Sequence, residues 1–125
     1  MSNIQIKHIS WDLNKSFNIS RGSKTTAETI EVKIETNNFY GYGECVPYKR
    51  YDETIDSVTS EIYNLKPDIE EGNINLTNLD RFLKNGAARN AIDCAMWDLE
   101  CKIKNTSIWK VMGVTKPTTL PGSYT

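Results

Sequence analysis

The 125-residue sequence has only three cysteines and one histidine, and this scarcity disfavours several kinds of site. Cys94 and Cys101 fall on one predicted helix, where their Cα atoms would lie about 10.5 Å apart, too far for a disulfide. We expect both to be buried thiols, with Cys45 as the odd third cysteine. His8 stands alone in a strand-like segment, whereas zinc sites and Cys–His nucleophiles need these side chains close together. Metal ligation and thiol catalysis by this chain are therefore disfavoured.

Long apolar runs and excess charge are also missing. No stretch approaches the length of a membrane-spanning helix, and the N-terminus carries charges where a signal peptide needs an apolar segment. Fifteen basic residues oppose sixteen acidic ones, without the dense basic run of a nucleic-acid binder. We expect a cytoplasmic protein without nucleic-acid or membrane partners. A hydrophobic content of 38% suits one domain with a modest core.

The first 45 residues show the two-residue period of β-strands. Apolar and polar side chains alternate in segments 4–13 and 28–36, and a third strand-like segment covers 39–46. Asn37 and Asn38 tolerate positive φ, so they predict a tight hairpin between the second and third segments. This part of the chain is predicted to form a three-stranded antiparallel sheet.

After Tyr51 the apolar period becomes helical. One helix is predicted from Ile55 until Pro67, and one long helix over residues 86–104. A short amphipathic segment ends at Gly113, and residues 116–125 could add one more strand. The apolar stripe of the long helix comprises Ala88, Ala91, Ile92, Ala95, Met96, Leu99 and Ile103. Strands followed by helices indicate an α+β fold.

Two patterns resemble functional sites but favour a structural interpretation. Gly41 and Gly43 lack the third glycine of a phosphate loop, so they indicate tight packing at a hairpin edge. Asp93 and Asp98 lie five positions apart on a helix and point to different faces. Each has a basic residue four positions away, so ion pairs within the helix are expected.

Three blocks of sequence, "SFNISRGSK", "GYGECVPYKRYDET" and "GAARNAIDCAMWDLECK", together with "SIWKVMGV", resemble a known family. They are similar to the N-terminal capping domain of the enolase superfamily, and within it to the dipeptide epimerases that interconvert L-Ala-D-Glu and L-Ala-L-Glu in murein peptide metabolism. The resemblance implies an α+β domain, a three-stranded meander followed by helices, that closes over a TIM barrel. Residues 1–116 would form this domain, and residues 117–125 would begin the first barrel strand.

The same resemblance places the chemistry outside this chain. In that family the barrel supplies a K-x-K motif, three acidic Mg²⁺ ligands and a second lysine. Lys102 and Lys104 match the letters of the motif, but they fall at a helix end with no acidic cluster after them. We therefore expect the barrel to be missing and the isolated chain to be inactive. The implied partners are a small dipeptide and the barrel, which would bind Mg²⁺. The sequence leaves open whether the protein also forms a homo-oligomer.

Two segments are predicted to be loops that meet over the substrate, residues 17–26 and 46–54. Their cations would pair with peptide carboxylates, arginine in a bidentate manner, and their tyrosines would provide apolar walls with a hydroxyl. The candidate substrate-binding residues are Ile19, Arg21, Lys24, Tyr48, Arg50 and Tyr51. Lys24 corresponds best to a basic position of the dipeptide epimerases, whereas Arg21 has the better geometry for a carboxylate, so both remain candidates for the glutamyl side chain.

Other functions are compatible with the same fold. The parent protein could be a muconate cycloisomerase or an o-succinylbenzoate synthase, although cationic loops suit an acidic dipeptide better than an apolar lactone. The chain could also be a non-enzymatic binding protein that keeps the capping fold.

Overall fold

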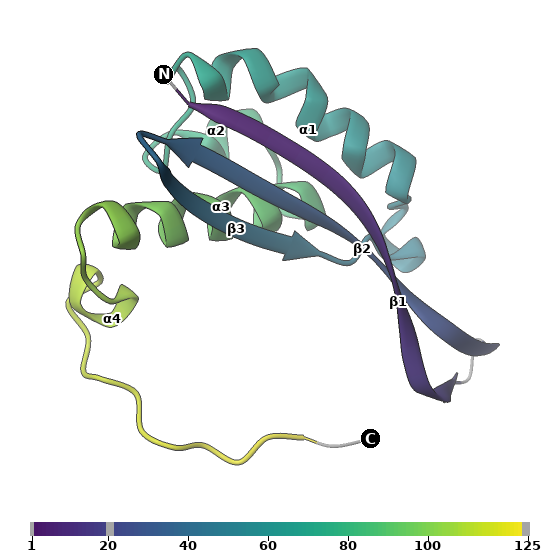
Figure 1. Cartoon of the computed structure of the whole chain (residues 1–125). Coiled ribbons are helices and arrows are strands. Elements are labelled where there is room, and N and C mark those ends of the chain that lie inside the picture. The colour runs from purple at the N-terminus through teal and green to yellow at the C-terminus, as the bar shows by residue number, and fades with distance from the viewer. Residues whose placement is uncertain (1, 20–21, 124–125) are drawn as a thin grey trace.

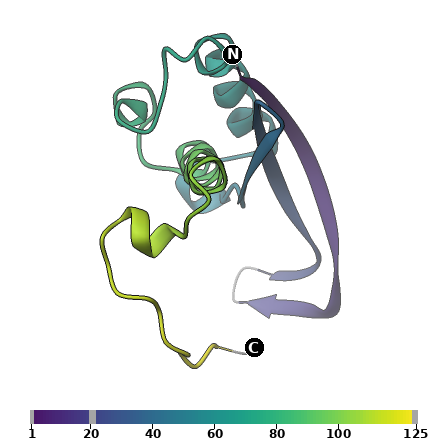
Figure 2. The same cartoon turned by 60° about the vertical axis from the view of Figure 1, so that its left-hand side comes forward.

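The structure is a computed structural model that describes residues 2–19 and 22–123, with only the backbone described at residues 16–19 and 22. Its elements form two layers, a sheet and a group of helices that cover one face of the sheet (Figures 1 and 2). In chain order the elements are β1 (Asn3–Ile19), β2 (Gly22–Thr36), β3 (Phe39–Cys45), a 3-10 helix (Lys49–Tyr51), α1 (Ile55–Glu70), α2 (Leu79–Phe82), α3 (Ala87–Ile103) and α4 (Ile108–Val111).

The sheet is antiparallel with strand order β1-β2-β3, which confirms the predicted meander. Thr36 pairs with Phe39 across the second hairpin. Asn37 and Asn38 have φ values of 50° and 68°, the positive angles that a two-residue hairpin turn requires. The asparagine pair therefore forms the tight turn that the sequence predicts.

The loop predicted over residues 17–26 is wrong, because its described residues, 17–19 and 22–26, continue the sheet. Phe17 pairs with Lys24 and Ile19 with Gly22, so the strands run to the described ends of the hairpin. Between the pairs Asp12–Thr26 and Phe17–Lys24 the register shifts, which leaves residues 13–16 opposite Thr25 alone. Such a bulge interrupts the two-residue period on which the strand prediction depends.

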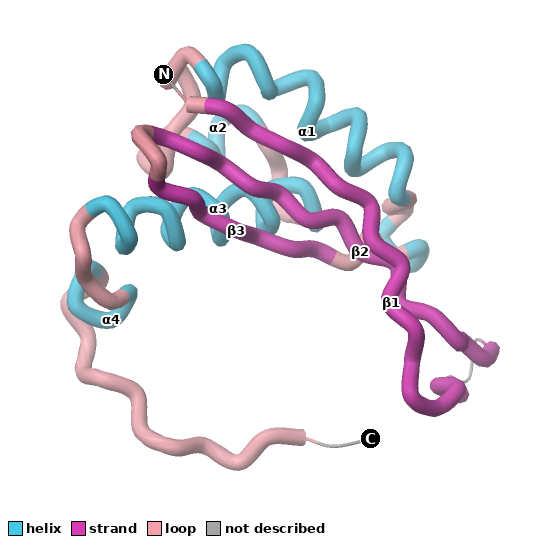
Figure 3. Tube along the Cα trace, viewed as in Figure 1, coloured by secondary structure: helices cyan, strands magenta, loops and turns pink. Residues whose placement is uncertain are grey.

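β3 pairs only with residues 30–36 of β2, so the two longer strands extend beyond it (Figure 3). We call this two-stranded part, residues 9–19 and 22–29, the distal ribbon. A side-chain network joins all three strands where the ribbon leaves the sheet. Trp11 Nε1 donates to Thr29 Oγ1 (3.0 Å) and Glu44 Oε2 (3.1 Å), and Thr29 Oγ1 donates to Glu44 Oε2 (2.8 Å).

α1 begins at a capping box, in which the Ser57 amide donates to Thr54 Oγ1 and the Thr54 amide to Ser57 Oγ, both at 2.9 Å. The prediction that this helix ends at Pro67 is wrong, since it continues to Glu70. Proline has no backbone N–H, so Pro67 removes one hydrogen bond of the helix. Because Pro67 lies near the end of α1, the helix can lose this bond and still continue to Glu70. The short helix α2 was not predicted, because four residues carry too little periodicity.

α3 confirms the long helix predicted over residues 86–104, with its caps at Gly86 and Lys104. Six of the seven predicted stripe residues are buried, and only Ile103, the last residue of the helix, is exposed at 43%. A Cβ atom on Gly41 would overlap the carbonyl oxygen of Ala95, and one on Gly43 that of Ala91. These contacts show that the two glycines let β3 pack directly against the helix backbone.

The core lies between the sheet and the helices. Its fully buried side chains come from β1, β2, α1, α3 and the segment before α2: Ile4, Ile30, Val32, Val58, Ile62, Ile74 and Ile92. Cys45 also belongs to the core, but the prediction of buried thiols is wrong for Cys94, which is exposed, and for Cys101, which is partly exposed. Both cysteines lie beside the apolar stripe of α3 and not on it.

After α4 the chain leaves the two layers. Gly113 has a φ of 69°, as expected of a glycine that ends a helix, and residues 114–123 are exposed and form neither helix nor strand. The additional strand predicted over residues 116–125 is therefore not formed in the described part of this segment. Within the described residues, no helix is long and apolar enough to cross a membrane.

Candidate functional site

The segment after β3 folds into a compact turn beside the distal ribbon. The carbonyl oxygen of Tyr48 accepts hydrogen bonds from the amides of Tyr51 (2.9 Å) and Glu53 (3.3 Å), and the amide of Asp52 donates to Lys49 (3.0 Å). Asp52 closes the 3-10 helix in the left-handed conformation, with a φ of 58°. The predicted loop at residues 46–54 is thus an ordered turn built around the Tyr48 carbonyl.

The structure brings one predicted cation and two predicted tyrosines together. Lys24 Nζ, from the ribbon, lies 5.8 Å from the centre of the Tyr48 ring. The rings of Tyr48 and Tyr51 lie 5.7 Å apart and are tilted by 50°. An ammonium group within about 6 Å of an aromatic face is attracted by the electrons of the ring. Two segments more than twenty positions apart therefore share one surface of cation and aromatic rings.

The other predicted site residues lie around this cluster or outside the described structure. Arg50 is exposed on the 3-10 helix, and Tyr51 is 69% exposed, so its ring is available to a ligand. Ile19 is the last residue of β1, next to the hairpin end, and only its backbone is described. Arg21 lies outside the described residues.

Glu53 connects the turn to α3 and was not identified from the sequence. Its Oε1 accepts the amide of Tyr48 (3.2 Å), and its Oε2 accepts the amide of Ala87 (2.7 Å), in the first turn of α3. The two amides are 39 positions apart in the chain, so no local pattern could reveal the link. The only signal was an acidic residue within the block "YKRYDET", which carries four charged residues, two of each sign.

Burial, together with two nearby acidic side chains, disfavours the reactive thiolate form of Cys45. Burial raises the pKa of Cys45 to about 11, and the negative charges of Glu53 and Glu44 add to this effect. A thiol nucleophile needs the opposite, a pKa lowered toward neutrality. The sequence argument against thiol catalysis agrees with this environment.

The lysines of the K-x-K match serve in helix ion pairs, as the helical interpretation predicts. Lys102 Nζ lies 2.8 Å from Asp98 Oδ2, and Lys104 Nζ lies 2.6 Å from Glu100 Oε1. The other predicted pairing is not made, because Arg89 donates to Asn85 (2.7 Å) instead of pairing with Asp93. No group of three metal-ligating side chains occurs in the described part of the chain, so its residues do not fit a Mg²⁺ site.

Comparison with protein families identifies the domain. Residues 1–113 match the family described as "Mandelate racemase / muconate lactonizing enzyme, N-terminal domain". The chain belongs to this family. The predicted resemblance to the capping domain of the enolase superfamily is confirmed, and so is its fold class, an antiparallel three-stranded sheet with helices on one face.

Relatives of this N-terminal domain are epimerases and racemases. The chain is 38% identical to the L-Ala-D/L-Glu epimerase of Escherichia coli over 120 residues, 96% of this chain and 37% of the enzyme. It is 41% identical over 92 residues to an N-acetyl-D-glutamate racemase from Pseudoalteromonas, 73% of this chain and 29% of that protein. The chain thus spans 29% to 37% of the length of these two curated relatives.

A solved structure supports the same relationship. An enolase family member from Agrobacterium tumefaciens, with homology to dipeptide epimerases, superposes with a TM-score of 0.86 at 37% identity. The match covers 92% of this chain and 35% of that one, whose structure contains sodium and L-Ala-L-Glu. The capping domain described here therefore has the fold that such enzymes carry at their N-terminal end.

Proposed function

We propose that this domain recognises the substrate of a cytoplasmic epimerase that acts on an acylated glutamate, with L-Ala-D-Glu and L-Ala-L-Glu as the first candidates. The observation that carries the proposal is the convergence of Lys24 with Tyr48 and Tyr51, from two separate segments. Lys49 and Arg50 add positive charge to the same turn. A cationic surface with aromatic walls suits a small, negatively charged molecule.

The chemistry of epimerisation explains why such a surface is useful. Removal of the α-proton of a glutamyl residue places further charge on a carboxylate that is already anionic. A Mg²⁺ ion held by the barrel would stabilise that charge, and the barrel would supply the groups that move the proton. The side chains of this domain would bind groups remote from the reacting carbon and exclude water, which favours the transition state.

Each predicted residue has a role in this proposal. Lys24 or Arg21 binds the side-chain carboxylate of the glutamyl residue, and Arg50 adds a second cation. Tyr48 and Tyr51 form the wall of the site. Ile19, at the end of the ribbon, provides an apolar contact to the substrate.

A second candidate substrate is an N-acetylated glutamate, because a relative that is 41% identical is an N-acetyl-D-glutamate racemase. Both candidates carry a glutamyl α-carbon, an acylated nitrogen and a side-chain carboxylate. They differ at the far end, where the dipeptide has a charged amine and the acetylated amino acid a methyl group. The carboxylate-binding role of Lys24 or Arg21 would be the same for both.

The test is a chimera in which residues 1–113 replace the matching domain of the Escherichia coli relative. In this chimera, Lys24→Met and Arg21→Met should identify the residue that binds the carboxylate. Loss of one charge-assisted hydrogen bond costs about 1.5–3 kcal/mol, so the responsible substitution should lower kcat/KM for L-Ala-D-Glu roughly ten- to a hundredfold. Turnover of dipeptides with an apolar second residue should be preserved.

Lys7→Met is the matched control, since Lys7 is an exposed lysine on β1 that lies outside the proposed site. It should leave kcat/KM unchanged. Equal losses on acidic and apolar dipeptides would mean that the segments form a general lid and do not recognise a carboxylate. Preference for N-acetylglutamate over Ala-Glu would select the second candidate.

A further inference from the structure

We propose that Glu53 is a positioning residue that fixes Tyr48 and Tyr51 relative to α3 and thereby sets the affinity of the site for its substrate. The proposal depends on the proposed function for its effect on substrate, but the role of Glu53 in ordering the turn stands on the geometry of this chain alone. Glu53 itself does not need to touch the substrate.

The carboxylate of Glu53 is bonded to two separate parts of the backbone. Oε1 accepts from the Tyr48 amide at 3.2 Å, and Oε2 accepts from the Ala87 amide at 2.7 Å. The Glu53 amide in turn donates to the Tyr48 carbonyl oxygen at 3.3 Å. Both backbone groups of Tyr48 are therefore held by Glu53, which is itself anchored to the helix.

A carboxylate suits this position better than its neutral isostere. Both partners are N–H donors, and an ionised carboxylate offers an acceptor to each of them. Glutamine would offer one oxygen and turn its NH₂ group toward the other donor. The first turn of α3 also favours a negative charge through the helix dipole.

The surrounding chain leaves room for the carboxylate. A Cβ atom at Gly86 would lie 3.0 Å from Glu53 Oε2, so the absence of a side chain at Gly86 lets the carboxylate approach the helix end. α3 in turn packs on β3 through Gly41 and Gly43. Glu53 thus links the turn that carries the two tyrosines to the packed layers.

The first experiment measures amide hydrogen exchange by NMR in the 125-residue chain. Glu53→Ala should make the Tyr48 and Tyr51 amides exchange roughly tenfold faster, because the bonds that hold the turn are lost. Glu53→Gln should have an intermediate effect. Glu61→Gln is the matched control, since Glu61 lines the same cavity as Glu53, and it should leave both amides unchanged.

The exchange pattern separates positioning from helix capping. If Glu53 served only as a cap for α3, its substitution would speed exchange at Ala87 and leave Tyr48 and Tyr51 unchanged, and that result would overturn the proposal. The amide of Ile92, in the buried centre of α3, reports whether the domain stays folded. Selective loss of protection at the two tyrosines, with Ile92 still protected, is the expected result.

The second experiment measures kinetics in the chimera defined above. Glu53→Gln should raise KM for the preferred substrate several-fold and change kcat less, because misplaced tyrosines weaken binding without touching the proton-transfer groups. If hydrogen exchange showed that Glu53→Gln loosens the turn while KM stayed unchanged, the proposed effect of Glu53 on substrate affinity would be wrong. A chimera that epimerises no acylated glutamate would instead contradict the proposed function, and hydrogen exchange would still test Glu53.

Discussion

At the scale of single residues, Gly43 determines how closely the two layers approach. The atom that an added Cβ would meet is the carbonyl oxygen of Ala91, which belongs to the helix backbone and cannot rotate away. We predict that Gly43→Ala lowers the free energy of unfolding by about 3 kcal/mol or more, the upper range for overpacked cores. Urea denaturation followed by circular dichroism measures this change.

Gly122→Ala is the control for this substitution, because nothing lies within 4 Å of the position that its Cβ would occupy. It should alter the free energy of unfolding by no more than about 0.5 kcal/mol. If the two variants were equally stable, α3 would be able to move away from β3, and the close packing would not constrain the fold.

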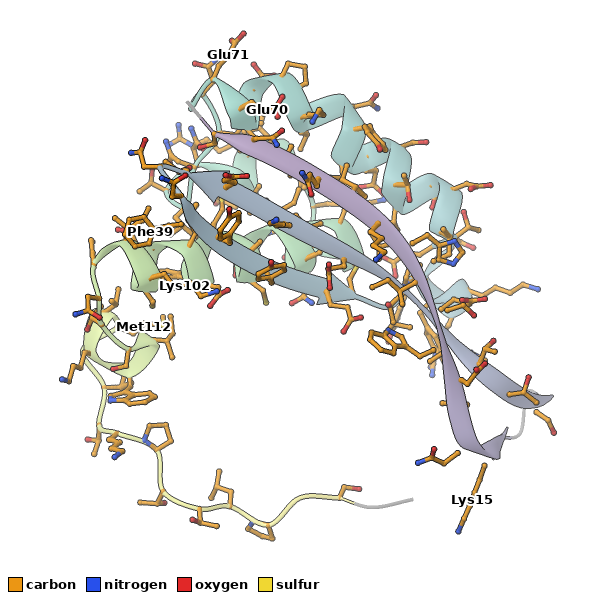
Figure 4. All side chains as sticks on the ribbon, viewed as in Figure 1. Lys15, Phe39, Glu70, Glu71, Lys102 and Met112 are labelled. Carbon is orange, nitrogen blue, oxygen red and sulfur yellow. The ribbon has the colours of Figure 1, made fainter. Side chains whose placement is uncertain are left out.

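At the scale of elements, both edges of the sheet are capped in the same way. On β1, the Ile4 amide donates to Glu70 Oε2 (3.0 Å), and Lys66 Nζ donates to the Ile4 carbonyl oxygen (2.7 Å). Lys66 and Glu70 form an ion pair at 3.2 Å on α1. Figure 4 shows Glu70 beside the start of β1 and Lys102 beside β3.

The same arrangement occurs on β3, where α3 supplies the pair. The Tyr42 amide donates to Asp98 Oδ2 (2.9 Å), and Lys102 Nζ donates to the Tyr40 carbonyl oxygen (2.8 Å). Unpaired strand edges are templates for association with another strand. Helix-borne ion pairs on both edges occupy backbone groups that would otherwise be open to such pairing.

The capping of β3 predicts a pH dependence. Partial burial raises the pKa of Asp98, but hydrogen bonds from Lys102 and the Tyr42 amide outweigh it and hold the pKa below its usual value. A lowered pKa in the folded state stabilises the fold above the ordinary carboxyl range, and this stabilisation is lost as the pH falls through the folded pKa. Asp98→Asn should therefore cost about 1 kcal/mol at pH 6, and the difference from wild type should shrink toward pH 3.

Chemical denaturation at several pH values tests this prediction. Glu70, whose pKa is lowered by the Ile4 amide and Lys66, is present in both proteins, so its contribution cancels in the comparison. Asp93→Asn is the control. Asp93 lies on the same helix, but Asp98 is the residue that accepts the Tyr42 amide, so the Asp93 substitution should leave the edge of β3 unchanged. A pH-independent difference for Asp98→Asn would show that its charge does not support the strand edge.

The sequence predicts an element well when the residues that determine it are close together in the chain. The Asn37–Asn38 turn and α3 were predicted because their signals lie within a few residues of each other. The outer part of the distal ribbon, residues 17–19 and 22–26, was mistaken for a loop, since four residues opposite one interrupt the period of the strands. Lys102 was correctly paired with Asp98 by spacing, but its bond to Tyr40 spans 62 positions and needs the tertiary fold. Glu53 was missed for the same reason.

At the scale of the whole molecule, the described residues bring Lys24, Tyr48 and Tyr51 together but contain no group of three metal-ligating side chains. We predict that the 125-residue chain alone has no epimerase activity. Incubation with Mg²⁺ and L-Ala-D-Glu in D₂O should leave the α-proton signal intact in NMR, whereas the full-length Escherichia coli relative serves as the positive control. Deuterium incorporation above background would contradict both this prediction and the assignment of the chemistry to a barrel.

The distal ribbon extends from the sheet as an arm that carries Lys24. The arm starts where Trp11, Thr29 and Glu44 join the three strands, and Lys24 lies five residues before Thr29 in β2, toward the outer end of the ribbon. At the usual strand rise this arm is about 17 Å long, so a rotation of roughly 10° about its inner end would move Lys24 by about 3 Å. That displacement is about half of the 5.8 Å between Lys24 Nζ and the Tyr48 ring. A small change of angle where Trp11, Thr29 and Glu44 are hydrogen-bonded would therefore be enough to change the distance between the Lys24 ammonium and the Tyr48 ring substantially.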